Sequence, residues 1–113
     1  MTKYLISFPS EAMIVADGEW EAVGRDSHAV VDEAKAAGVY VFGGGIDEDV
    51  PPVVVAADGT VTDGTYPGVK VPNGGYCILE LPTREAAMEW AAKLAVACRC
   101  SQEVRQFQDD PQS

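Results

Sequence analysis

The sequence has few basic residues, and this scarcity excludes several classes of partner. Among its 113 residues, eight are Lys or Arg and eighteen are Asp or Glu, so the formal net charge is -10 at pH 7. A surface of this charge repels phosphate backbones and anionic lipid headgroups. We therefore expect a protein that binds no nucleic acid and no membrane, and in which the excess of acidic residues maintains solubility.

Long apolar runs are also missing. No stretch approaches the roughly 20 apolar residues that a membrane-spanning helix needs. Met1-Thr2-Lys3 leads directly into a short strand pattern, without the apolar segment and cleavage site of a secretory signal. The sequence predicts a cytoplasmic protein, and its length predicts one domain over residues 1–113.

The sequence contains few cysteines, and their number is odd. Cys77, Cys98 and Cys100 are the three cysteines, and an odd count in a chain of cytoplasmic type argues against a disulfide framework. Cys98 and Cys100 resemble half of a metal or redox site, but the second pair of ligands that a zinc site needs is absent from the pattern. We interpret all three as structural residues and expect no cofactor.

Hydrophobic periodicity divides the chain into short strands and two helices. The predicted strands are residues 3–8, 39–42, 53–56, 61–62, 75–81 and 103–107, and the predicted helices are residues 19–37 and 84–97. Gly24 weakens the first helix, so a later start near Asp26 or Ser27 is the alternative. Asp58-Gly59 is typical of a hairpin turn, and residues 109–113 are expected to be a frayed tail.

This order of elements predicts an α+β fold of the β-α-β-β-α-β, ferredoxin-like type, with two helices on one face of a largely antiparallel sheet. Gly43-Gly44-Gly45 follows the second strand, but no helix begins after it, as a phosphate-binding loop would require. We interpret this glycine run as a bulge or a close approach of two backbones.

The predicted strands are apolar on both faces. Side chains alternate along a strand, so Tyr40 and Phe42 are expected on one face, and Val39 and Val41 on the other. Because two helices cover only one face, the sequence predicts a homodimer in which two sheets stack face to face. The alternative is that residues 47–52 or the C-terminal tail fold over the second face.

Four short motifs occur in order along the chain: Asp63-Gly64-Thr65-Tyr66, Gly74-Gly75-Tyr76, the helix from Arg84 to Ala91, and Glu103-Val104-Arg105. In this series the chain resembles the YCII-related (YciI-like) domain family, in the branch named for its DGPF motif. The resemblance extends from the first strand to Phe107. It implies a ferredoxin-like α+β fold of the dimeric α/β-barrel type, and a histidine and an aspartate that have suggested an enzyme of unknown reaction.

Carried over by motif, the family histidine corresponds to His28 and the family aspartate to Asp63. The chain departs from the family where Thr65-Tyr66 replaces Pro-Phe and where Gln106 replaces a proline. It departs again where Gly68 and Val71 replace two glutamates on either side of Lys70. Chemistry that depends on those glutamates is not expected here.

The residues themselves leave alternatives for this site. His28 is the sole histidine, and it is either an acid-base group or a surface residue paired with Asp32, four positions later. Asp63 either orients the His28 ring or only stabilises its own turn. The side chains of Tyr66, Tyr76 and Ser7 are candidates for lining the same pocket.

Two functions follow from this reading. The first is a small dimeric enzyme in which His28 and Asp63 perform acid-base chemistry on an unidentified small molecule. The second is a non-catalytic dimeric module that binds a metabolite or a protein, with a link to transcription that the family resemblance suggests. The distance between the His28 ring and the Asp63 carboxylate separates the two.

Overall fold

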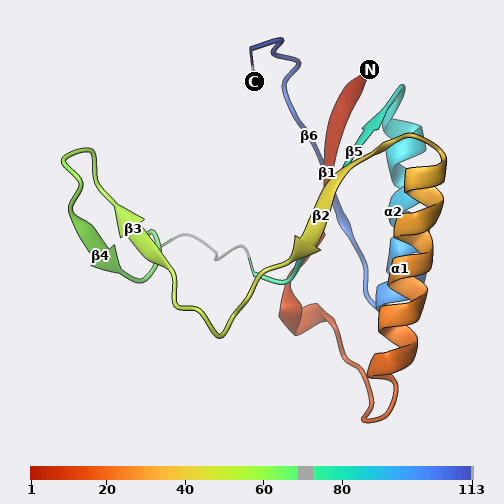
Figure 1. Ribbon diagram of the computed structural model, residues 1–113, viewed down its shortest axis with the longest axis horizontal. Helices are drawn as coiled ribbons and strands as arrows, with labels where there is room; N and C mark the ends of the chain where they lie inside the picture. Colours follow the sequence, from red (N-terminus) through yellow and green to blue (C-terminus); the bar gives the residue numbers. More distant parts are fainter. Residues whose placement is uncertain (69–72, 113) are drawn as a thin grey trace.

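A computed structural model describes residues 1–68 and 73–112, and Figure 1 shows its ribbon. The elements are β1 (Thr2–Phe8), a 3-10 turn η1 (Ser10–Ala12), α1 (Trp20–Ala36), β2 (Tyr40–Gly45), β3 (Val53–Val55), β4 (Val61–Asp63), β5 (Gly75–Leu81), α2 (Arg84–Cys98) and β6 (Glu103–Gln106). Each predicted strand and helix is present with its boundaries within one residue of those expected, except that β2 extends three residues beyond its predicted end. In the described residues, neither helix has the length and hydropathy to span a lipid bilayer.

Four strands form the main sheet in the order β2-β5-β1-β6, and every neighbouring pair is antiparallel. The two helices lie side by side on one face of this sheet (Figure 1). This arrangement is compatible with the predicted ferredoxin-like α+β fold. β3 and β4 form a separate two-stranded sheet, so the hairpin adds no strand to the main sheet.

The core lies between the main sheet and the helices. Ile6, Leu79 and Leu81 are its largest fully buried side chains, and they pack against Ala87 and Leu94 of α2. The alternation of β5 explains this layer, because Cys77, Leu79 and Leu81 all point towards the helices. α2 faces the sheet with alanines, and these small side chains let the helix approach the strands closely.

The helix ends follow local rules. The Thr83 hydroxyl accepts a hydrogen bond from the Ala86 amide at 3.1 Å and so caps α2. α1 begins at Trp20, so the alternative of a later start is wrong and Gly24 is tolerated inside the helix. Gly38 follows α1 with a φ of +75°, a conformation that suits glycine.

One expectation for β2 is wrong. Tyr40 lies opposite Leu79 of β5, whereas Phe42 lies opposite Ile78, so the register shifts between the two. Such a shift is a β-bulge, in which two residues oppose one on the partner strand and the alternation of faces starts again. Tyr40 therefore faces the helices, while Phe42 faces the opposite side of the sheet.

The face of the sheet opposite the helices is called here the open face. Leu5 and Ile78 are paired at its centre, and Phe42 at its β2 edge is 64% exposed. The C-terminal tail lies along one end, because the Phe107 amide donates to the Lys3 carbonyl and the Thr2 hydroxyl to Asp109. The tail covers this end only, so the alternative in which it covers the whole face is not realised.

Residues 46–68 form an extension that we call the arm. It contains β3 and β4, joined by the predicted turn, in which the Thr60 amide donates to the Asp58 carboxylate at 2.9 Å. The arm projects away from the body on the side of the open face, whereas the helices lie on the other side (Figure 1). Residues 47–52 therefore lead away from the sheet and do not cover it.

Candidate functional site

A cavity of about 420 Å³ lies between α1 and the β2–β5 side of the sheet. This volume falls within the range of about 300–1,000 Å³ that is typical of small-molecule sites. Its apolar walls come mainly from Ile6, Phe8, Val23, Val31 and Leu94. Its polar lining comes from Ser27, His28, Lys35, Tyr40 and Gln102.

The floor of the cavity is made of glycine backbone. Gly43, Gly44, Gly45 and Gly75 all line it. A Cβ added at Gly43 would lie 2.8 Å from the Tyr40 hydroxyl, and one added at Gly75 would lie 2.6 Å from the Phe8 ring. At Gly43 the added Cβ would also lie 3.0 Å from the backbone carbonyl oxygen of Tyr76, so the predicted close approach of two backbones is present there, and the Tyr40 side chain lies over the same residue.

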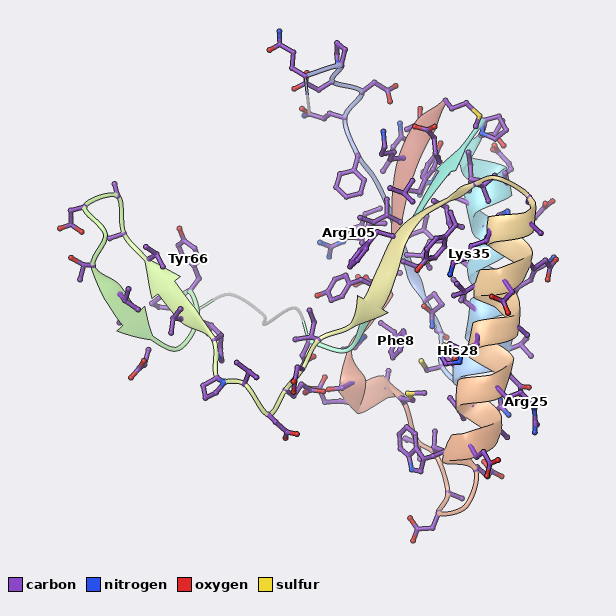
Figure 2. All side chains as sticks on the ribbon, in the orientation of Figure 1. Phe8, Arg25, His28, Lys35, Tyr66 and Arg105 are labelled. Atoms are coloured by element: carbon purple, nitrogen blue, oxygen red, sulfur yellow. The ribbon has the colours of Figure 1, made fainter. Side chains whose placement is uncertain are left out.

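His28 reaches the cavity from α1. Figure 2 shows it between α1 and the sheet, with Phe8 and Lys35 on the same side. Within residues 1–68 and 73–112, the His28 ring forms no hydrogen bond or ion pair, and the expected alternative pair with Asp32 is not formed. Its neighbour Ser27 donates to the Gly24 carbonyl at 3.1 Å. The imidazole nitrogens are thus available to a molecule in the cavity.

Lys35 supplies the cavity with a positive charge. Its Nζ lies 5.3 Å from the centre of the Tyr40 ring, a cation–π distance. Among the described lining residues there is no Asp or Glu. Burial, together with the nearby Cys77 thiol, raises the pKa of the Tyr40 phenol, so this hydroxyl stays neutral and able to donate a hydrogen bond. In a chain of net charge -10, this is a local site suited to an anion.

The cysteines have the properties of buried thiols. Burial, with a smaller contribution from Cys98, raises the pKa of Cys77 to about 11. Burial also raises the pKa of Cys98 and of Cys100. Because the thiolate is the reactive form, these cysteines are poor nucleophiles near neutral pH. All three are free, and the described residues contain no cluster of three or more potential metal ligands.

The other predicted site residues do not meet His28 within one chain. Asp63 ends β4 on the arm, and Tyr66 is 71% exposed on the arm, away from the cavity (Figure 2). Ser7 is buried but outside the cavity lining. Tyr76 belongs to the lining, although its register opposite Ser7 points its side chain towards the open face. Val71 lies outside the described residues.

Sequence reasoning missed Lys35 and Phe8 as lining residues. A signal for Lys35 was present, because residues seven positions apart lie on the same side of a helix and Lys35 follows His28 by seven. Phe8 gave no comparable signal, since its place over Gly75 depends on the pairing of β1 with β5.

In comparisons with known proteins, no protein-family model and no curated protein matches this chain.

Proposed function

We propose that the protein is a small acid-base enzyme that acts on a small organic anion in the cavity between α1 and β2. The observation that carries the proposal is the position of His28, the sole histidine, on the wall of a cavity of about 420 Å³. Imidazole exchanges protons readily near neutral pH, and one general acid or base contributes about 10²–10⁴-fold to a rate.

The lining indicates the class of substrate. Lys35 supplies positive charge, and the Tyr40 hydroxyl supplies a donor beside it. Phe8, Val23 and Val31 offer apolar surface on the remaining walls. A compact molecule with an apolar body and one carboxylate matches this division, because its charge meets Lys35 and its body displaces water from apolar walls.

The proposal includes a homodimer of the dimeric α/β-barrel type, in which the open faces of two copies stack. Phe42 and Val41 are exposed on or beside this face, and burying them against a second sheet is favourable by about 25 cal/mol per Å² of apolar surface. The resemblance to YCII-related domains leads to the same assembly and to His28 and Asp63 as the functional pair.

A non-catalytic binding module is the second candidate function. It is favoured by one observation: in a single chain no described carboxylate lines the cavity beside His28. An imidazole without an orienting partner is a less effective acid or base. Binding of a metabolite in the cavity requires only Lys35 and the apolar walls.

Calorimetry tests binding first, with benzoate and with benzyl alcohol as probes. Benzyl alcohol has the same ring as benzoate but no charge. We expect benzoate to bind, benzyl alcohol to bind more weakly, and Lys35→Met to weaken benzoate by about 10–100-fold, the usual effect of losing a hydrogen-bonded charge. Arg25→Met is the matched control, because Arg25 lies on α1 but outside the cavity lining. The anion site is contradicted if benzoate and benzyl alcohol bind equally well. It is also contradicted if Lys35→Met and Arg25→Met lose the same benzoate affinity.

Catalysis is then tested with phenylpyruvate, an apolar 2-keto acid, by following deuterium exchange at its CH2 group by NMR in heavy water. We expect exchange faster than in buffer, and we expect His28→Gln to abolish this excess while phenylpyruvate still binds. Binding of phenylpyruvate without any excess exchange supports the binding module over the enzyme.

A further inference from the structure

The arm carries apolar side chains that the rest of its own chain leaves exposed. Val53, Val55 and Val61 on its two strands are all more than half exposed, and Tyr66 is 71% exposed. Each strand has three residues, and an isolated two-stranded hairpin is marginally stable in water. A surface that covers the arm is therefore missing from the single chain.

The shape of the chain points to a second copy. The radius of gyration is 15.8 Å, against about 13 Å for a compact chain of this length. The open face spans four strands and gives only about 300 Å² in flat projection, whereas a stable dimer buries about 800 Å² on each partner. Because Phe42 and Ile46 continue the exposed apolar surface from the open face into the arm, a copy stacked there contacts both.

The arm is long enough to reach the cavity of such a copy. Stacked sheets lie about 10 Å apart, and a helix layer lies about another 10 Å beyond. Asp63 lies opposite Val53, so the relevant reach is that of the eight residues from Ile46 to Val53, which span at most about 26 Å when extended. They leave the body on the side where the second copy would lie (Figure 1).

Charge favours the same contact. Residues 46–68 contain five acidic residues and no basic residue, whereas the described lining of the cavity contains Lys35 and His28 and no acidic residue. Asp47 accepts a hydrogen bond from the Asp49 amide, Glu48 from Ser10, and Asp58 from the Thr60 amide. Asp63 and Asp49 are the two arm carboxylates that form no hydrogen bond within the described residues.

We propose that two copies of this chain exchange their arms, so that Asp63 of each copy reaches the mouth of the other copy's cavity and positions the His28 ring there. Asp63 is then a positioning residue: its carboxylate accepts the N–H of one ring nitrogen and leaves the other nitrogen to the substrate. This inference rests on the proposed role of His28, and it supplies the carboxylate that the cavity lacks within one chain.

The test uses histidine labelled with ¹³C, because the single histidine gives one set of ring signals. Labelled wild-type chain is unfolded and refolded with a large excess of unlabelled Asp63→Asn chain, and the reverse mixture is prepared in the same way. At one fixed pH, we expect the His28 signal to follow the residue at position 63 of the unlabelled copy. Asp49→Asn, which removes another unpaired carboxylate from the arm, is the matched control and leaves the signal unchanged.

Each other outcome overturns the inference. A His28 signal that follows its own chain places Asp63 beside His28 in cis, and a signal that ignores position 63 removes Asp63 from the site. If Asp63→Asn and Asp49→Asn change the His28 signal equally, the change reflects only the lost charge and not a contact with Asp63.

A second measurement does not depend on Asp63. Tyr66 is replaced by the photo-reactive amino acid benzoylphenylalanine, and the irradiated protein is analysed by mass spectrometry. We expect cross-links between chains that map to α1 or β2 of the other copy, and none from the same group placed at Ile14, which is exposed outside the arm. Cross-links confined to one chain overturn the exchange of arms. If benzoate still binds through Lys35 in that case, the cavity function stands and only the exchange fails.

Discussion

The Arg99 guanidinium joins the end of α2 to α1 through the Asp26 carboxylate, at 2.9 Å. Arg99 also donates to the Ala97 carbonyl at 2.6 Å, although its own backbone has a φ of +61°, in the left-handed region. The ion pair fixes the two helices relative to each other at the end of α2 where Cys98 contributes to the cavity wall.

Replacing Arg99 separates its two roles. We expect Arg99→Ala to lower the free energy of unfolding by about 1–2 kcal/mol through the lost hydrogen bonds. Arg99→Gly loses the same bonds but relieves a left-handed backbone that costs about 1 kcal/mol, so it should be the more stable of the two variants. Urea denaturation measures the difference, and an alanine variant as stable as the glycine variant contradicts the argument from strain.

The glycine floor makes a prediction for Gly43. Its Cβ would lie 2.8 Å from the Tyr40 hydroxyl and 3.0 Å from the Tyr76 carbonyl oxygen, so Gly43→Ala should lower the free energy of unfolding by about 1–3 kcal/mol. Gly44→Ala is the control, since nothing lies within 4 Å of its Cβ. Adding Tyr40→Phe to Gly43→Ala should recover part of the loss, because it removes the hydroxyl from the contact.

The open face makes a prediction for assembly. Phe42→Glu should shift the protein towards the monomer or towards aggregates, because a stacked sheet would bury an unpaired carboxylate. Val96→Glu is the control, since Val96 is 77% exposed on α2, on the helical side of the molecule. Sedimentation at micromolar concentration should give about twice the chain mass for wild type and for Val96→Glu. A monomeric wild type contradicts the dimer.

Cys77 makes a prediction for alkaline pH. Its pKa rises from 9.0 to about 11 on folding, through burial, so between these values the folded state holds a proton that the unfolded state has released. The stability that this thiol contributes is present below pH 9 and is lost as the pH rises through about 11. Denaturation at several pH values should show a fall over this window that is smaller in Cys77→Ala. If the free energy of unfolding falls equally in wild type and in Cys77→Ala, groups other than Cys77 cause the fall.

Most of the secondary structure is predictable from the sequence because its signals are local. The Asp58-Gly59 turn, the Thr83 cap and the alternation in β5 each depend on residues within one turn or strand. The bulge in β2 is not predictable in this way. Which residue of β2 has no partner on β5 depends on how the two strands pair across the sheet.

The candidate site shows the same division. His28 was identifiable as the single histidine, and its helix placed it within reach of a pocket. The sequence also identified Asp63 as the end of a strand. It did not indicate that the hairpin carrying Asp63 would project from the body. Whether a hairpin joins the main sheet or leaves it depends on contacts between distant segments, which no local pattern records.

The bulge in β2 determines whether the space beneath α1 is filled or empty. In a regular strand, Phe42 would follow Tyr40 onto the helical side, and its ring would project into the cavity between β2 and α1. A shift of one residue in the pairing of β2 with β5 therefore separates a chain with a solid interior from a chain with a chamber. A relative in which Phe42 paired without this shift would keep the same fold and have nowhere to hold a ligand.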